Sequence, residues 1–573
     1  MADLLREIAT LLELKGENPF KTRAYRNGAD VVESYPGDIV ADAAEDRLKG
    51  TKGIGDALQQ KLQEYASTGE LGYYDNLRAE FPETIFELFE IQGLGPKKIK
   101  ALYSNLGVAS IARLKEVAES GEAASMSGFG KKTCEKILEA IEFREQNASR
   151  FRLNDVAPHV EEILEFLQGH PRVARAEVAG SYRRGKETVG DLDFIAETKA
   201  GPEVIGDFVK QEFCTRVIVE GGTKASINLE SGVQVDLRCV STAEFPFTLA
   251  YFTGSKEHNV ALRARALEKG LTLNEYRLAP KGEDEPAPGT EDIRDEKGIY
   301  DFLGLDFVDP ELRENGGEIE AAEKGKLPNL IEKMNLRGTF HNHTRASDGK
   351  ATLEEMAAAA QELGLQYLGI ADHSKASFQA NGLDEPRLRS QIAEIKELNK
   401  GFDGFRIFTG TEVDILKDGS LDFDDELLAE LDYSVASVHN AFTLPEKDMT
   451  KRLIRAIENP YVTMLGHLTG RLLLKREPYE VDVPAIIEAC AATGTIIELN
   501  ANPWRLDMDW RWWKLAKEKG VKCAINPDAH ATAQLQFLHY GVLTARKGWL
   551  EKADVVNCLA LGEIEAVLAA KRG

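Results

Sequence analysis

The 573-residue chain has few cysteines, and none of them form a close pair. Its six cysteines are scattered, which excludes a disulfide framework and a thiol-based metal site and suits a reducing compartment. No apolar run approaches the ~18 residues of a membrane span. The first twenty residues mix acids into an amphipathic helical pattern, unlike a signal or transit peptide. These absences predict a cytoplasmic protein with no membrane segment.

The sequence also lacks an excess of positive charge. With 95 acidic and 71 basic residues its net charge is -24, which argues against a protein that coats nucleic acid with its whole surface. Any contact with nucleic acid should be local, through backbone amides, a few lysines or metal ions. The length exceeds one ordinary domain. The stretch 281–323 is acidic and rich in proline and glycine, and it indicates a solvated loop that leads into a linker.

Three segments of the helix-rich first 150 residues place Gly-apolar-Gly before a helix: KGIGDALQQKL (52–62), QGLGPKKIKAL (92–102) and SGFGKKTCEKI (127–137). Glycines let a backbone approach closely, and free N–H groups at a helix start favour an anion. The segments resemble helix-hairpin-helix motifs, which grip the DNA backbone without reading its sequence. Tight turns between packed helices are the alternative. The predicted DNA-binding glycines are Gly53, Gly55, Gly93, Gly95, Gly128 and Gly130.

The stretch GSYRRGKETVGDLDF (180–194) joins a glycine-serine turn and two arginines to two aspartates. Alternation after Asp191 predicts a strand, so Asp191 and Asp193 share one face and can converge on hard cations. A two-metal site needs a further carboxylate, and Asp236 in the strand-like run GVQVDLRCV is the best candidate. Two solvated acids at a strand edge are the alternative. The joint pattern resembles a nucleotidyltransferase palm.

The run YFTGSKEHN (251–259) makes the resemblance specific: residues 1 to about 315 resemble a bacterial-type family X DNA polymerase. The resemblance implies Mg²⁺ on the catalytic residues Asp191, Asp193 and Asp236, with Asp236 also assisting loss of the primer proton. It implies a dNTP site made by Gly180, Ser181, Arg184, Gly190, Tyr251, Phe252, Gly254 and Asn259. Gln234 stands where animal repair members carry an arginine.

The first 80 residues resemble the family's small 5′-phosphate-binding domain. The segment 18–36 supplies Lys21, Tyr25 and Arg26, a basic and aromatic cluster suited to phosphate contact. Lys61 falls where repair members place a Schiff-base lysine that removes deoxyribose phosphate. An ordinary surface lysine is the alternative, because only its position supports the lyase role.

Seven of the ten histidines lie beyond residue 340, six of them at the ends of strand-like runs beside acids or small residues. Imidazole and carboxylate together suit Mn, Zn or Fe better than Mg alone. The pattern resembles the polymerase and histidinol phosphatase (PHP) domain, a distorted (β/α)7 barrel with a site for three ions. Its nine ligand positions are filled by His341, His343, Asp348, His373, Glu412, His439, His467, Asp528 and His530.

The expected fold is multidomain α/β. Its six parts are a helical DNA-binding domain (1–80), helical fingers (81–150), a nucleotidyltransferase palm (151–245), a thumb (246–315), a linker (316–334) and a PHP domain (335–573). The expected function is short-gap filling in base excision repair with a separate metal-dependent 3′–5′ exonuclease, most suited to Mn²⁺. Gapped or primer-template DNA and dNTPs are the expected partners of a monomer. The alternatives are a 3′-phosphoesterase whose N-terminal half only binds DNA, and a DNA-end-binding scaffold.

Overall fold

The computed structural model describes residues 1–571 except 34, 36–38, 46 and 52, and the chain forms two compact units, Met1–Ala148 and Ser149–Gly573. Lys52, which begins the first Gly-apolar-Gly segment, lies outside the described residues, as do Ser34 and Pro36 at the end of the basic and aromatic segment. Each unit is described separately below. No helix in the described ranges is long and apolar enough to cross a membrane.

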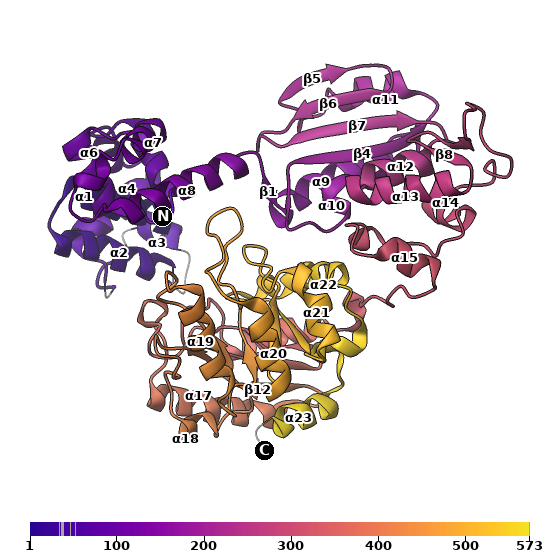
Figure 1. The fold of residues 1–573 in the computed structure, drawn as a ribbon. Helices are drawn as coiled ribbons and strands as arrows, with labels where there is room; N and C mark the ends of the chain where they lie inside the picture. The colour runs from indigo at the N-terminus through magenta and orange to yellow at the C-terminus, as the bar shows by residue number, and fades with distance from the viewer. Residues whose placement is uncertain (34, 36–38, 46, 52, 572–573) are drawn as a thin grey trace. The chain divides into compact units, whose positions relative to one another are not determined.

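The first unit is helical (Figure 1). The amphipathic pattern of the first residues forms α1, which buries Leu5, Ile8 and Leu12 against α2. A second apolar cluster joins α6, α7 and α8. The helices are α1 (Ala2–Lys15), α2 (Pro19–Glu33), α3 (Ile39–Ala44), α4 (Asp56–Thr68), α5 (Gly72–Arg78), α6 (Pro96–Leu106), α7 (Ile111–Glu119) and α8 (Lys131–Asn147).

The second unit begins with the predicted palm, a five-stranded sheet in the order β2-β4-β7-β6-β5. Strands β4 and β7 are parallel neighbours, and their register places Asp193 opposite Asp236. Figure 1 shows β4, β7, β6 and β5 side by side. The palm elements are β1 (Phe151–Arg152), α9 (Leu153–Gly169), β2 (Val173–Val178), α10 (Gly180–Arg183), β3 (Thr188–Val189), β4 (Asp191–Thr198), α11 (Gly201–Phe208), β5 (Arg216–Glu220), β6 (Lys224–Asn228) and β7 (Gln234–Val240).

The thumb that follows packs around a core that includes Leu262, Tyr300 and Leu312. Part of the predicted linker, 316–334, is ordered on this core: α15 buries Ala322, and Glu318 lies 2.6 Å from Nδ1 of buried His258. The thumb elements are α12 (Phe245–Thr253), α13 (Lys256–Glu268), β8 (Leu271–Leu273), β9 (Leu278–Pro280), α14 (Glu296–Phe302) and α15 (Glu318–Glu323).

The PHP region contains two parallel sheets, β10-β11-β12 and β13-β14-β15-β16-β17. Parallel bridges from His373 to Glu412 and from Asn342 to Ala529 join the two sheets at both borders, an arrangement consistent with the expected distorted barrel. The strands are β10 (Gly338–Thr339), β11 (Tyr367–Ile370), β12 (Arg406–Thr409), β13 (Glu412–Asp414), β14 (Val435–Ser437), β15 (Met464–Leu465), β16 (Ile496–Asn500) and β17 (Cys523–Asn526).

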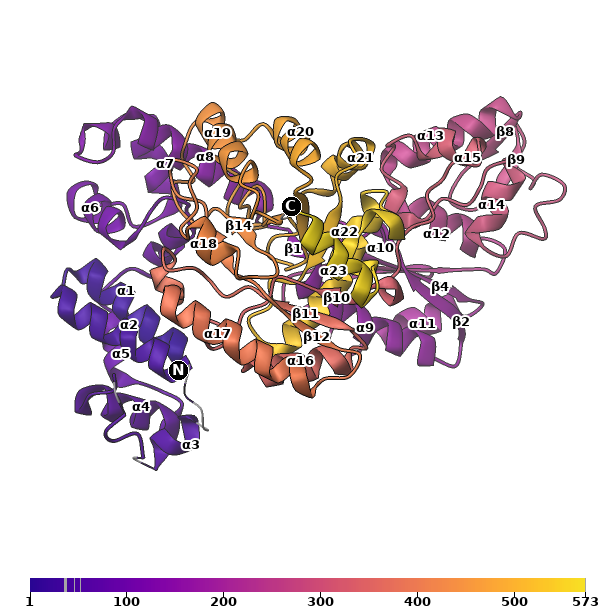
Figure 2. The same cartoon turned by 90° about the horizontal axis from the view of Figure 1, so that it is seen from below.

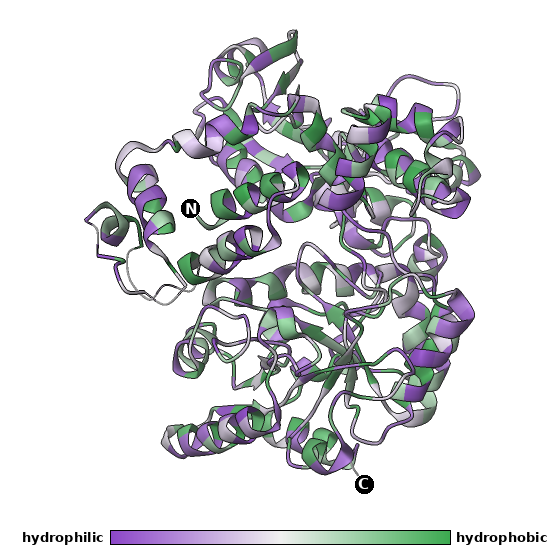
Figure 3. Ribbon diagram, turned by 90° about the vertical axis from the view of Figure 1, so that its left-hand side faces the viewer, coloured by the Kyte–Doolittle hydropathy of each residue, from purple (hydrophilic) through white to green (hydrophobic). Residues whose placement is uncertain are grey.

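Helices surround these strands, as Figure 2 shows for α16, α17 and α23 beside β10, β11 and β12. In Figure 3 the helices alternate hydrophilic and hydrophobic stretches, as helices with one buried face do. The helices are α16 (Leu353–Glu362), α17 (Glu385–Leu398), α18 (Asp425–Leu428), α19 (Glu446–Ile457), α20 (Val483–Thr493), α21 (Trp510–Glu518), α22 (Leu538–Lys547) and α23 (Leu561–Ala570).

The border between the two compact units differs from the border that composition suggests. The boundary between the units in the chain falls after residue 148, whereas the acidic stretch 281–323 lies inside the second unit. Palm, thumb and PHP region therefore form one compact body. Helix α22 of the PHP region contributes to this body, because its Arg546 lies 2.7 Å from Glu311 of the thumb.

Candidate functional site

The three predicted catalytic aspartates meet on the palm sheet. Asp191 and Asp193 lie two residues apart on β4, and β7 places Asp236 beside Asp193. Burial, followed by repulsion from Asp191 and Asp236, raises the pKa of Asp193 to about 7. Burial and Asp236 also raise the pKa of Asp191. Crowded carboxylates of this kind suit divalent cations, which would relieve their mutual repulsion.

Neighbouring side chains hold Asp236 in place from two strands. The hydroxyl of Ser226 on β6 donates a hydrogen bond to Oδ1 of Asp236, and Lys224 Nζ lies 3.5 Å from the same oxygen. Gln234 Nε2 donates to Oδ2 across 3.2 Å. The residue that replaces the arginine of animal members thus still contacts the third aspartate, but as a neutral donor.

The glycine-serine turn lies directly against these acids. Gly180 has φ +63°, and a Cβ there would lie 2.5 Å from Oδ2 of Asp193, so a larger residue would be strained and would displace this carboxylate. The two arginines of the motif separate. Arg184 faces the cleft, whereas Arg183 turns to the thumb and pairs with Glu296 at 2.6 Å.

A cleft of about 370 Å³ collects most of the predicted nucleotide-binding residues. It is lined by Gly180, Ser181, Arg184, Asp191, Asp193, Tyr251, Phe252, Gly254, Lys256, Asn259 and Arg263. Predicted Gly190 is not part of this lining; it joins β3 to β4. A Cβ on Gly254 would lie 3.1 Å from Nη1 of Arg184, so this glycine makes room for the arginine. Lys256 and Arg263 on α13 were not predicted and add positive charge.

The glycine turns of the first unit share one geometry. Gly53, Gly93 and Gly128 all have positive φ, and each is followed two residues later by the glycine that caps a helix: Gly55 for α4, Gly95 for α6 and Gly130 for α8. A Cβ would meet nothing within 4 Å at Gly55, Gly93, Gly95, Gly128 or Gly130. This open space before a helix N-terminus suits an approaching phosphate.

An aromatic ring that was not predicted connects the predicted 5′-phosphate residues. Tyr73 stacks on Tyr25 with ring centroids 6.2 Å apart, and Lys61 Nζ lies 4.7 Å from the Tyr73 centroid. Lys21 Nζ lies 5.8 Å from the same ring. Arg26 instead pairs with Glu13 of α1. Spacing could not reveal Tyr73, because helix packing brings it to the others.

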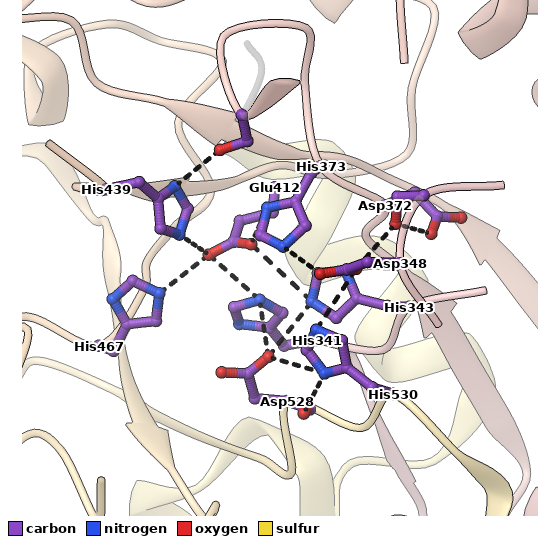
Figure 4. Close-up of polar contacts among 12 residues, drawn as sticks. His341, His343, Asp348, Asp372, His373, Glu412, His439, His467, Asp528 and His530 are labelled. Atoms are coloured by element: carbon purple, nitrogen blue, oxygen red, sulfur yellow. Dashed lines mark hydrogen bonds and ion pairs between the residues drawn. The ribbon is translucent and has the colours of Figure 1, made fainter. Parts of the chain in front are cut away.

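All nine predicted PHP ligands converge (Figure 4). The carboxylate of Glu412 on β13 lies at their centre, 2.8 Å from Nδ1 of His373 and 2.9 Å from Nε2 of His467. His439 and His341 lie 3.2 and 3.3 Å from it. Because the strands of both sheets are parallel, the loops and strand ends that carry these side chains lie at the same edge.

Within the described ranges, the ligands form three overlapping groups that could each hold an ion. They are His343-Asp348-His373-His530, His341-His343-Asp528 and His373-Glu412-His439. Nε2 of His341 and both ring nitrogens of His343 are buried without a hydrogen-bond partner among the described residues. The residues fit metal ligation, since an ion would supply these nitrogens with a partner.

The protonation preferences of two members of the cluster, His343 and Glu412, suit ligation. Burial, then neighbouring His530 and His373, lowers the pKa of His343 to about 4, which leaves its imidazole neutral. Burial would raise the pKa of Glu412, but the surrounding histidines outweigh it and hold that pKa well below the ordinary value. Neutral imidazole and ionised carboxylate are the states that bind metals.

Three further PHP residues support the cluster and were not predicted. Glu498 on β16 is fully buried and lies 2.7 Å from Nδ1 of His341. Asp414 lies 3.1 Å from Nδ1 of His439. Such carboxylates orient a ligating imidazole. Arg505 lines the pocket and lies 3.4 Å from Asp528. Asp372, beside His373, instead accepts hydrogen bonds from Thr344 of the neighbouring loop.

The acid triad on the palm sheet, the thumb that follows it and the histidine-rich cluster of the PHP region are together typical of a DNA polymerase joined to a metal-dependent phosphoesterase domain. Family models match a helix-hairpin-helix domain at 1–71, a SAM-like helix-hairpin-helix tandem at 85–142, the DNA polymerase beta thumb at 248–314 and the PHP domain at 339–502.

The chain is 40% identical over 569 residues to the DNA polymerase/3′-5′ exonuclease PolX of Bacillus subtilis. The aligned residues cover 99% of this chain and 98% of that protein. The chain therefore belongs to the bacterial-type family X DNA polymerases with a C-terminal PHP domain.

Two more distant relatives each resemble one part of the chain. A probable phosphatase of Caldicellulosiruptor saccharolyticus is 33% identical over 34% of this chain and 81% of its own length. DNA polymerase lambda of Arabidopsis thaliana is 25% identical over 55% of this chain and 61% of its own length.

Proposed function

We propose that this polymerase fills short gaps in DNA during base excision repair and trims 3′ ends at a separate PHP site. The observation that supports the proposal is that one chain brings together two separate groups of side chains suited to metal binding, the three aspartates of the palm and the nine-residue cluster centred on Glu412. The first is suited to joining nucleotides, and the second to hydrolysing a phosphodiester.

At the polymerase site the cleft residues bind and orient the nucleotide. Ser181 and Arg184 hold the triphosphate, Tyr251 and Phe252 pack against the sugar, and Asn259 reaches the base edge. Asp236 accepts the proton of the primer 3′-hydroxyl, while Ser226 and Gln234 hold its carboxylate in position. Two Mg²⁺ ions on the triad would align the attacking and leaving oxygens and neutralise their charge.

At the PHP site seven of the nine predicted ligands, all except His341 and His343, line a pocket of about 230 Å³, and Arg505 lines the same pocket. The guanidinium of Arg505 is the cation available to orient the phosphodiester of a 3′ end. Up to three bound ions, which we propose to be Mn²⁺, would lower the pKa of water and stabilise the departing oxyanion. Mixed imidazole and carboxylate ligands also admit Zn²⁺ or Fe.

The helical unit binds the DNA backbone. The open glycine turns before α4, α6 and α8 would hold the sugar-phosphate backbone without reading its sequence. We propose gapped or primer-template DNA and dNTPs as partners of a monomeric enzyme. Its action on DNA and its scattered cysteines support a cytoplasmic location.

The surroundings of Lys61 favour an additional deoxyribose-phosphate lyase activity. Its ammonium lies against the Tyr73 ring, and Lys21 approaches the same ring from another helix, so a 5′-phosphate would find two cations here. Borohydride should trap wild-type protein on 5′-deoxyribose-phosphate DNA, whereas Lys61→Ala should not be trapped. Equal trapping of both proteins would exclude Lys61 as the nucleophile.

The decisive experiment is extension of a one-nucleotide gap with dNTPs and either Mg²⁺ or Mn²⁺, alongside trimming of a 3′-labelled strand. We expect extension with Mg²⁺ and trimming with Mn²⁺. Trimming without extension under any metal would support the alternative of a phosphoesterase whose N-terminal half only binds DNA. If the protein performs neither reaction and retains no metal on elemental analysis, the result would support the alternative of a DNA-end-binding scaffold.

A further inference from the structure

Helix α22 of the PHP domain ends at a lysine that is completely buried. The side chain of Lys547 has 0% exposure, although lysine is among the residues that are rarely buried. An ammonium group in such a position must satisfy its three donors. The hydrogen-bond acceptors around Lys547 therefore indicate which part of the protein this side chain positions.

All three acceptors around Lys547 belong to the polymerase part of the chain. Its Nζ lies 2.6 Å from Oε1 of Glu314, donates to the carbonyl of Arg184 across 3.0 Å and reaches the carbonyl of Glu311 at 3.4 Å. Burial lowers the pKa of Lys547 to about 8, against the opposing effect of Glu314. The Lys547 side chain thus links helix α22 of the PHP region to the palm and the thumb.

The same Glu314 carboxylate also contacts the Arg184 side chain. Nε of Arg184 lies 3.0 Å from Oε1 of Glu314, the oxygen that Lys547 contacts, and Nη1 donates to the carbonyl of Thr253 across 2.5 Å. Lys547 therefore holds Arg184 twice, directly through its backbone carbonyl and indirectly through its guanidinium.

Arg184 lines the cleft with Asp191 and Asp193. Two of its guanidinium nitrogens are fixed, and among the described residues none accepts a hydrogen bond from Nη2. The fixed nitrogens set the plane of the group, and Nη2 remains available to an anion in the cleft. This is how a preorganised arginine binds phosphate with little loss of side-chain freedom.

We propose that Lys547 is a positioning residue of the polymerase site, through which the PHP domain fixes Arg184 for the nucleotide triphosphate. The inference rests on the proposed role of Arg184 in triphosphate binding. Without the ammonium, Glu314 would keep Arg184 as its main cationic partner, and the Arg184 carbonyl would lose its donor. Both changes oppose binding of the triphosphate.

The test compares full-length Lys547→Met with Arg546→Met in one-nucleotide gap filling, with dNTP concentration varied. Arg546 is a matched control: it lies on the same helix and contacts Glu311 and Asp309 of the same interface, but it does not contact Glu314 or Arg184. We expect Lys547→Met to raise KM for dNTP about tenfold with little change in kcat, the size expected for a lost charge-assisted hydrogen bond. Arg546→Met should leave KM within about twofold, and both variants should retain 3′ trimming.

A charge-balanced variant covers the case in which Lys547→Met does not fold because Glu314 is left buried. Lys547→Met/Glu314→Gln removes both charges together, so it should fold and still show the raised KM. An unchanged KM in whichever of these two variants folds, or an equal rise in Arg546→Met, would overturn the inference.

Arg184→Met separates this inference from the proposed function. If Arg184→Met raises KM for dNTP and the Lys547 variants do not, only the positioning role fails. If Arg184→Met itself leaves KM unchanged, the proposed triphosphate role of Arg184 fails and the inference fails with it.

Discussion

The polymerase cleft and the PHP cluster both present carboxylates for divalent cations, but they differ in what balances the negative charge. In the cleft, three aspartates face one another, and burial together with mutual repulsion raises the pKa of Asp193 to about 7. In the PHP cluster, histidines surround Glu412 and hold its pKa well below the ordinary value. Divalent cations would relieve the repulsion among the aspartates of the cleft, whereas in the cluster the histidines themselves already balance the charge of Glu412.

The largest expected effect tests whether the cleft alone performs synthesis. Asp193→Ala removes a ligand from the centre of the triad, so gap filling should fall by roughly 10³-fold or more. Trimming of a 3′-labelled strand with Mn²⁺ should be unchanged. Asp207→Ala, an exposed acid of the same domain, is the control. Equal loss of both activities in a folded Asp193→Ala protein would contradict two independent sites.

The reverse experiment uses His343→Ala. His343 belongs to two of the three ligand groups, so its loss should weaken two ion positions and reduce trimming by roughly 10²- to 10³-fold. Gap filling should persist. His539→Ala is the matched control, because this PHP histidine lies on α22 outside the ligand groups. Trimming that survived His343→Ala would place the exonuclease elsewhere.

A smaller effect should follow from Glu498→Gln, which keeps the shape of the side chain that orients His341 and removes its charge. Outer carboxylates of this kind are worth about 10- to 100-fold in metal affinity. We expect more Mn²⁺ to be needed for half-maximal trimming, with gap filling unaffected. Glu488→Gln, at a partly exposed ion pair, should change neither quantity. A trimming response equal to that of wild type would show that Glu498 does not tune the site.

The smallest effect concerns stability of the thumb beside the cleft. Glu296 is buried between Arg183 and Arg313; burial would raise its pKa, but the two arginines lower it to about 2. A depressed carboxyl pKa stabilises the fold above the unfolded value of about 4.5, and this stabilisation is lost as pH falls toward 2. Glu296→Gln should therefore cost about 3 kcal/mol at pH 7 and less at pH 3.

Differential scanning calorimetry at both pH values checks this expectation. The Tm difference between wild type and Glu296→Gln should shrink as pH falls. Asp301→Asn, which removes an exposed ion pair with Lys297, should lower Tm little at either pH. A Tm difference that grew at low pH would contradict the assigned direction of the pKa shift.

Local patterns predicted much of the two sites because their key residues follow regular spacing. Period-two alternation placed Asp191 and Asp193 on one face of β4, and the resemblance to the PHP domain named nine residues that the fold brings together. The predicted helix-hairpin-helix turns also appear, with glycines of positive φ before α4, α6 and α8. In each case the chemistry depends on neighbours in the sequence or on the shared edge of a parallel sheet.

Other features depend on packing between distant segments, so spacing could not reveal them. Residues 316–334 were predicted to form a linker, yet α15 packs on the thumb, where Glu318 contacts His258 about sixty residues earlier in the chain. The two adjacent arginines were predicted as parts of one motif. In the structure, Arg183 pairs with Glu296 of the thumb, whereas Arg184 lines the cleft.

The sequence by itself determined which chemistry the chain can perform, since ligand type, ligand order and strand alternation are local properties. Only the tertiary structure decided which residues orient those ligands: Glu498 behind His341, Tyr73 beside Lys61, and Lys547 beneath Arg184. The physical reason is that a buried charge or ring finds its partner through the packing of whole elements. That packing depends on the shape of the folded core, which cannot be predicted from any short stretch of sequence.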